Sequence, residues 1–281
     1  MSTVMISAAD VNKLRQITGA GMMDCKKALS EANGDFEAAI DFLRKKGQKV
    51  AANRSDRDAK EGLVVTKVTA DGKRGVLVVV NCETDFVAKN EEFGAFVNTI
   101  VDVALASNPK TAEELKALNF TGTTITVGEK ITEQVGKIGE KIEISRYEVI
   151  IGEKVLGYNH PGNRVASLVG FNKSTTKDID VIAKDVAMQI AAMAPVALDK
   201  DDVDAETLKR EIEIGKEQAR QEGKPEEMLE KIAMGKLNKF YKESTLLNQE
   251  FIKDNKISIG QYLANNDKEL KILGFKRHSL S

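Results

Sequence analysis

The decapeptide NCETDFVAKN, residues 81–90, joins an apolar run, VLVVV (76–80), to a stretch with helical periodicity. A run of β-branched residues favours a buried strand, and such a strand normally leaves the core through a polar turn. Here the turn carries Phe86 next to Asp85. The Phe86 ring therefore either folds back into the core, which is the commonest place for a Phe side chain, or points outward, where a partner could bind it.

A β-hairpin is predicted on the N-terminal side of this junction. The runs LVVTKV (63–68) and VLVVV bracket the segment ADGKRG (70–75), whose Asp71-Gly72 pair is a turn signal. On the C-terminal side we expect a helix from about Glu91 to Ala106, which should cover one face of the hairpin. Its apolar residues recur at helical spacing: Phe93, Phe96, Val97, Ile100, Val101 and Ala104.

The same order of elements recurs later in the chain. After a short helix, TAEELKAL (111–118), and a strand, KIEISRYEVII (141–151), a second hairpin is predicted from VLGYNHPGN (155–163) and RVASLVGFN (164–172). A helix then follows in IDVIAKDVAMQIAAMAP (179–195) and should end at Pro195. A hairpin followed by a covering helix, twice, suggests an internal duplication.

Three short helices are predicted for residues 7–47. The third is the clearest, since Asp35 can cap it and its apolar residues fall at i, i+3, i+4 and i+7. Gly47 is expected to end this helix, and the charged, aperiodic residues that follow read as a linker. A bundle this small has a thin core and is typical of a docking module. In the second helix Met22 and Met23 are adjacent, hence about 100° apart, so at least one should be exposed unless both close the bundle at its edge.

Residues 201–242 are expected to form a protruding antiparallel helical hairpin. Two charged helical patterns are joined there at Gly223-Lys224-Pro225, with Pro225 as the first helical residue. The chain should then return to the main body as a short helix and a strand. The predicted fold class is α+β, with these boundaries: a three-helix module (1–47), a linker (48–61), a first core subdomain (62–143), a second core subdomain (144–200 and 243–281), and the insert (201–242).

Composition excludes several classes of function. The 42 Lys and Arg residues almost balance the 43 Asp and Glu residues, for a net charge of −1, so no nucleic-acid or membrane binding is expected. Cys25 and Cys82 lack metal-ligand spacing and should lie in or near cores. The sequence contains no P-loop motif, so direct nucleotide binding is not expected. A metal site and a cofactor are not expected either. The N-terminus lacks a signal peptide and no apolar run spans a membrane, so a cytoplasmic protein is expected.

Nearly the whole chain resembles the bacterial elongation factor Ts family. The N-terminal module of that family resembles residues 14–47, LRQITGAGMMDCKKALSEANGDFEAAIDFLRKKG, and its central signature resembles NCETDFVAKN. The order continues with KIGEKI (137–142), YNHPGNRV (158–165) and VAMQIAAMAP (186–195), then a helical insert. The resemblance implies a guanine nucleotide exchange factor, not an enzyme, for the GTPase elongation factor Tu. It also implies a ubiquitin-associated-like module, a two-subdomain core, and an insert used in self-association as a homodimer.

The resemblance also implies site residues. The segment Thr84, Asp85, Phe86 and Val87 would enter the GTPase near its magnesium and phosphate site. The other contacts with elongation factor Tu would come from Arg15, Met22, Met23, Lys26, Ile138, Gly139 and His160. Two departures stand out: Asn12 replaces a basic residue of some members, and the chain ends at GFKRHSLS without a further helix that many members have.

Two other functions remain open on the residues alone. An enzyme could use Cys82 or Cys25 as a nucleophile, which would require a low-pKa thiolate beside a base. A helical adaptor could bind an RNA or a protein tail without changing GDP release from any GTPase. A lone His160, with no Ser, Cys or Asp partner in the sequence pattern, favours binding over catalysis.

Overall fold

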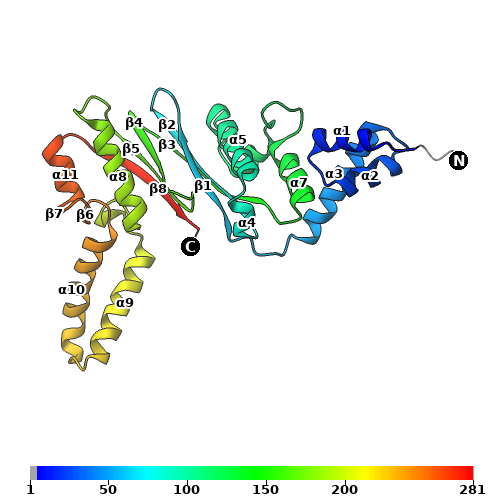
Figure 1. The fold of residues 1–281 in the computed structure, drawn as a ribbon. Helices are drawn as coiled ribbons and strands as arrows, with labels where there is room; N and C mark the ends of the chain where they lie inside the picture. Colours follow the sequence, from blue (N-terminus) through cyan, green and yellow to red (C-terminus); the bar gives the residue numbers. More distant parts are fainter. Residues whose placement is uncertain (1–4, 281) are drawn as a thin grey trace.

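The computed structural model describes residues 5–280, and within them two antiparallel three-stranded sheets form the centre of an α+β fold (Figure 1). The first sheet has the order β1 (Glu61–Val68), β2 (Arg74–Cys82), β3 (Glu143–Ile151). The second has the order β4 (Lys154–Asn159), β5 (Val165–Phe171), β8 (Ile272–Ser279). Both predicted hairpins are confirmed. Residues 1–4 and 281, at the ends of the first and last expected segments, lie outside the described residues.

The two sheets pack face to face between two layers of helices. Val64 and Leu77 of the first sheet contact Ala166 of the second. The outer face of the first sheet packs on α5 (Glu91–Ser107), α6 (Ala112–Ala117) and α7 (Val127–Ile138), and that of the second on α8 (Ile179–Met193) and α11 (Ile259–Asn266). A two-stranded ribbon, β6 (Glu250–Phe251) and β7 (Asp254–Ser258), lies beside α11. The predicted order of hairpin and covering helix therefore occurs in each half.

The two halves are joined along the free edge of β1. The Asn159 side chain imitates a neighbouring strand, because its Oδ1 accepts the Thr66 N–H at 2.7 Å and its Nδ2 donates to the Thr66 carbonyl at 3.1 Å. Val64 N–H donates to the Asn163 carbonyl at 2.7 Å. These bonds satisfy edge groups that would otherwise face solvent and fix the turn that carries His160.

The N-terminal module consists of α1 (Ala8–Thr18), α2 (Met22–Glu31) and α3 (Phe36–Asn53), packed around Leu14, Cys25 and Leu29. The expected end of the third helix at Gly47 is wrong, and residues 48–53 of the expected linker are helical. Gly47 instead lies against α7: a Cβ there would come 2.9 Å from the Thr132 carbonyl oxygen, and one at Gly136 would come 2.8 Å from Gly47 Cα. The glycines permit the two helices to touch.

One expectation about the core is wrong, and one helix of the core was missed. The boundary expected after residue 143 is wrong, because β3 pairs with β2 along Arg74–Asn81 and so completes the first sheet. Helix α7 was not predicted from the sequence at all.

The insert projects from the body as α9 (Ala205–Gln221) and α10 (Glu226–Ser244), preceded by a 3₁₀ turn at Lys200–Asp202 (Figure 1). The helical hairpin predicted there is confirmed, although α10 runs two residues past the expected end. Pro225 is the N-cap residue and not the first helical residue. The helices meet over a narrow apolar seam that ends at Leu237 and includes Ala219, Leu229 and Ala233.

Candidate partner-binding surface

A one-turn helix, α4 (Asp85–Ala88), follows strand β2 and carries Phe86 at its tip. Thr84 is the N-cap residue, and its Oγ1 accepts the Val87 N–H at 3.4 Å. The helix buries none of its residues, and Phe86 is 83% exposed. Of the two positions that the sequence left open for this ring, the structure has the outward one.

The charge beside the ring is locally paired. Lys89 Nζ donates to Asp85 Oδ2 at 2.7 Å, at the i, i+4 spacing. This hydrogen bond, together with the lysine's positive charge, lowers the pKa of Asp85 below its usual value. The tip therefore presents an ionised carboxylate next to an apolar ring at neutral pH.

Three of the predicted site residues line one hollow. Phe86 and Val87 from α4 and Ile138 from the end of α7 border a cavity of about 330 Å³, with Phe93 of α5 at its wall. Lys137 Nζ and Glu92 Oε2 form an ion pair of 2.7 Å at its rim. Gly139 ends α7 at a φ of 81°, and a Cβ there would meet nothing within 4 Å. The backbone at Gly139 is thus open to approach.

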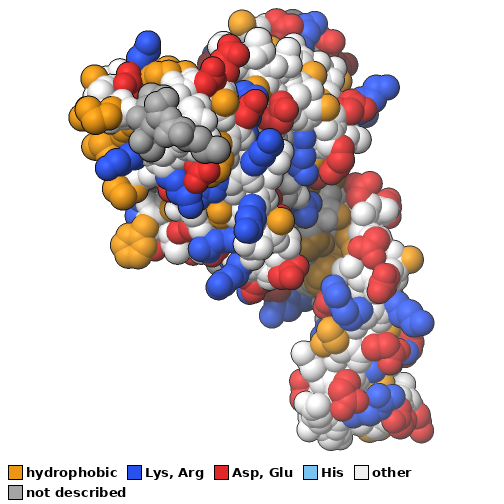
Figure 2. Space-filling view, turned by 90° about the vertical axis from the view of Figure 1, so that its right-hand side faces the viewer, with side chains coloured by type: hydrophobic (Ala, Val, Ile, Leu, Met, Phe, Trp, Pro, Cys, Tyr) orange, Lys and Arg blue, Asp and Glu red, His pale blue; other side chains and the backbone are white. Residues whose placement is uncertain are grey.

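The N-terminal module presents the second group of predicted residues. Met22 and Met23 are 47% and 75% exposed, and Arg15 and Lys26 are exposed as well. Hydrophobic side chains gather along the left edge of the view in Figure 2, in the half of the molecule that contains this module. The module lies against α7, because a Cβ at Gly19 would come 3.1 Å from Lys137 Nζ. Exposed apolar groups of the module and of α4 therefore flank the same helix end.

His160 lies apart from these groups, in the turn between β4 and β5. Its Nδ1 is 3.0 Å from the Tyr158 hydroxyl, and its ring is exposed. His160 borders a separate hollow of about 270 Å³, which Met188 of α8 and Ile252 also line. The structure does not bring His160 together with Phe86.

Two carboxylates that sequence reasoning missed hold the segment before Phe86. Glu140 accepts the N–H groups of Glu83 and Thr84 at 3.1 and 3.0 Å, and the Thr84 hydroxyl at 2.6 Å. Glu83 in turn accepts the Lys141 N–H at 2.6 Å and pairs with Arg54 at 2.8 Å. Although burial raises the pKa of Glu83, these bonds outweigh it and hold the pKa below its usual value. The only signal of these roles in the sequence is one acidic residue in each motif, Glu83 in NCETDF and Glu140 in KIGEKI.

The cysteines are poor candidates for catalysis. Both are buried, as predicted. Burial, helped by the negative charges of Glu140 and Glu61, raises the pKa of the Cys82 thiol to about 12. Among residues 5–280, no group of three or more His, Cys, Asp and Glu side chains could hold a metal ion. Nor does that part of the chain contain a helix long and apolar enough to cross a membrane.

Comparison with known proteins decides the family. The family model described as elongation factor TS matches residues 83–281. The chain is 57% identical to elongation factor Ts of Cytophaga hutchinsonii over 281 residues, which is 100% of both chains. This chain belongs to the elongation factor Ts family. Elongation factor Ts of Amoebophilus asiaticus is 52% identical over 97% of this chain and 98% of the relative, and that of Flavobacterium psychrophilum is 52% identical over 98% of each. As a member of the elongation factor Ts family, the chain is a translation elongation factor.

Proposed function

We propose that the chain is the guanine nucleotide exchange factor of elongation factor Tu. It acts in the cytoplasm, performs no covalent chemistry, and binds no nucleotide or nucleic acid itself. The observation that carries this proposal is the 83% exposed ring of Phe86 at the tip of a short capped helix. In this mechanism the segment Thr84–Val87 enters the GTPase and displaces the elements that hold magnesium and phosphate.

The energy for GDP release comes from binding the nucleotide-free partner more tightly than the GDP form. Because linkage is reciprocal, a factor with this preference weakens GDP binding by the same coupling free energy. Burial of a Phe side chain contributes about 1.5–3 kcal/mol, and each tenfold change in affinity requires about 1.4 kcal/mol. A single wedge of this size therefore accounts for roughly a tenfold to hundredfold effect.

The remaining predicted residues serve as further contacts. Arg15, Met22, Met23 and Lys26 bind the GTP-binding domain of the partner, since flexible thioethers adapt to a protein surface. Ile138 and Gly139 extend the contact around Phe86. His160 binds the partner at a different place, because it borders a hollow that shares no residue with the one beside Phe86.

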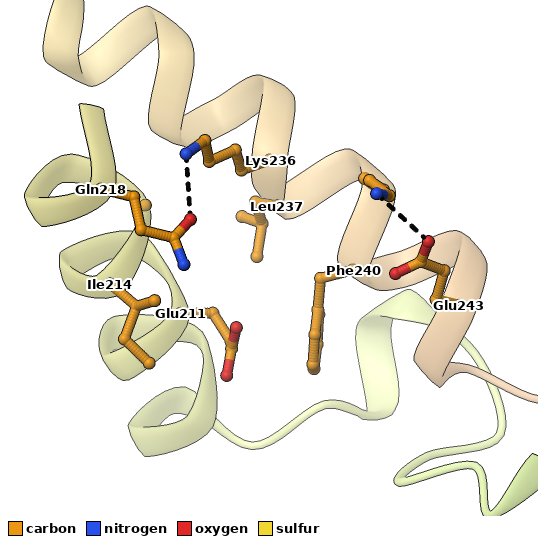
Figure 3. Close-up of a pocket in the computed structure, with 9 residues that line it drawn as sticks. Glu211, Ile214, Gln218, Lys236, Leu237, Phe240 and Glu243 are labelled. Carbon is orange, nitrogen blue, oxygen red and sulfur yellow. Dashed lines mark hydrogen bonds and ion pairs between the residues drawn. The ribbon is translucent and has the colours of Figure 1, made fainter. Parts of the chain in front are cut away.

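The insert is proposed to mediate self-association as a homodimer. Figure 3 shows Ile214 of α9 and Leu237 and Phe240 of α10 around an open hollow between the two helices, of about 350 Å³. Ile214 of α9 and Met234 of α10 remain 42% and 46% exposed. A second copy could bury this apolar surface, which one hairpin leaves uncovered.

Release of labelled GDP from elongation factor Tu tests the function. The chain should accelerate release at substoichiometric concentration. A chain alkylated under native conditions should be equally active, because both cysteines are buried. No acceleration would refute the exchange function and favour the adaptor, whereas loss of activity on alkylation would favour a role for a thiolate.

A further inference from the structure

Three chain segments meet directly below α4. They are the end of α3 with the turn after it, the end of β2, and the loop after α7. Arg54 Nη1 donates to both oxygens of Glu83, at 2.9 and 2.8 Å. Lys141 Nζ donates to the carbonyls of Ser55 and Arg57, at 3.0 and 3.1 Å. Two reciprocal hydrogen bonds complete this junction. Glu140 accepts the backbone N–H of Glu83, and Glu83 accepts the backbone N–H of Lys141, the residue after Glu140.

Glu140 also determines the geometry of the cap of α4. The Thr84 hydroxyl donates its hydrogen to Glu140 Oε1 at 2.6 Å, so its lone pairs are directed to the Val87 N–H, 3.4 Å away. The Glu83 and Thr84 N–H groups, which lie beyond the ladder of β2, donate to the same carboxylate. Glu140 thus satisfies three donors in consecutive residues of the turn that leads into the tip.

The orientation of Phe86 depends on this cap. A helix of one turn is unstable by itself. No residue of α4 is fully buried, although Val87 and Ala88 pack in part against the core of the first sheet, and the Phe86 ring is 83% exposed. Hydrogen bonds to a charged group are about twice as strong as neutral ones. The carboxylate of Glu140 therefore adds a strong polar restraint on Glu83 and Thr84, the two residues that lead into α4.

We propose that Glu140 is a positioning residue for nucleotide exchange. Acting through Thr84, it sets the direction in which Phe86 projects, while the Glu83–Arg54 pair ties that direction to the N-terminal module. This inference rests on the proposed exchange function and on Phe86 as the wedge. Glu140 itself does not need to touch the partner.

The test measures release of labelled GDP with Glu140→Ala, Phe86→Ala and the double variant. Glu140→Ala should slow release about tenfold, since small misplacements of a positioned group cost up to about a hundredfold. In the Phe86→Ala background the same substitution should have almost no further effect, because Glu140 is proposed to act only through the direction of the Phe86 ring. Once the ring has been removed, its direction has no consequence. Groups that act independently give additive effects instead. Glu140→Gln should restore only part of the rate, because its amide oxygen can still accept the two N–H groups but lacks the charge, and its NH2 group would reverse the hydrogen bond to the Thr84 hydroxyl.

Two further variants separate positioning from general damage. Glu153→Ala removes an exposed partner of Lys73, at 2.9 Å, and should leave exchange unchanged. Thr84→Val removes the capping hydroxyl at nearly constant volume and should also slow exchange. Because Thr84 is itself proposed to enter the GTPase, this effect supports positioning only if it, too, disappears in the Phe86→Ala background. Normal exchange by Phe86→Ala would refute the wedge and with it the proposed function. The positioning role alone would be overturned if Phe86→Ala slows exchange but Glu140→Ala and Thr84→Val do not. It would also be overturned if the effects of these two substitutions simply add to that of Phe86→Ala.

Discussion

The α4 tip and the helical insert both expose apolar side chains, but they are held in opposite ways. The tip is four residues long, and the two residues before it, Glu83 and Thr84, form charged hydrogen bonds to two other segments. The insert is long, holds itself together along one seam, and extends away from the sheets (Figure 1). A short element fixed from outside can direct one ring accurately. A long element fixed only by itself offers an extended surface but little control over its direction, which suits association with another copy.

Replacement of the ring at the tip should have the largest effect. Phe86→Ala should slow GDP release from elongation factor Tu at least about tenfold, because about 1.5–3 kcal/mol of wedge energy is lost. Its melting temperature should equal that of the wild type, since the ring is 83% exposed. Calorimetry and labelled-GDP release on the same sample measure both. Early melting with normal exchange per folded molecule would show that the ring is a core residue.

His160 should contribute less than the tip. His160→Ala removes an exposed ring that is hydrogen-bonded only to Tyr158 among the described residues, so affinity for nucleotide-free elongation factor Tu should fall about threefold to tenfold, or roughly 1 kcal/mol. Isothermal titration calorimetry measures this affinity. A Lys73→Ala variant, at an exposed turn, serves as the control. Unchanged affinity for His160→Ala would remove this residue from the interface.

Removal of the insert should change exchange less than either of these substitutions. Replacement of residues 204–242 by a short Gly/Ser linker should leave the sheets folded, because the seam of the insert lies within itself. Self-association should fall while exchange stays within about twofold, because Phe86, the Met pair and His160 all lie outside the insert and should act independently of it. Sedimentation and GDP release on the deletion variant decide the question. Lost exchange in a folded monomer would mean that the insert contacts the GTPase.

The smallest expected effect concerns acid stability at the tip. The folded-state pKa of Glu83 is lowered, so its ion pair and hydrogen bonds stabilise the fold above the unfolded pKa and are lost as pH falls through the lower folded pKa. The free energy of unfolding should therefore fall less between neutral pH and about pH 3 for Glu83→Gln than for the wild type. Urea titrations at both pH values give the difference. An identical pH dependence would show that this carboxylate titrates alike in both states.

The sequence predicted most of the elements because their signals are local. Both hairpins follow from β-branched runs around turn residues, and the cap at Asp35 and the left-handed Gly72 in the first turn are as expected. Gly47 misled the prediction, since a glycine that ends a helix and one that lets two helices touch look alike in sequence. The end of the first sheet was misplaced because the pairing of β3 with β2 is a contact across about 70 residues, which no periodicity reports.

The candidate site shows the same division between local and distant signals. The exposure of Phe86 on the short helix agrees with the expectation carried by the TDF motif, whereas its contact with a partner stays a prediction. The role of Glu140 could not be found, because it acts on residues 83 and 84 across a gap of 56 or 57 positions. Acidic side chains are common on surfaces, and only the fold shows which one faces a turn with unpaired N–H groups.

The continuity of α3 past Gly47 affects how two distant contacts would combine. The part of α3 past Gly47, residues 48–53, extends the third helix of the module by about 9 Å at 1.5 Å per residue, as far as its C-cap residue Arg54 under the tip. A flexible tether would have left the second contact to a search within a tethered volume. A rigid spacer instead presents both contacts at a fixed separation, so the module and the tip would behave as one bivalent ligand whose avidity is set by geometry and not by tether length.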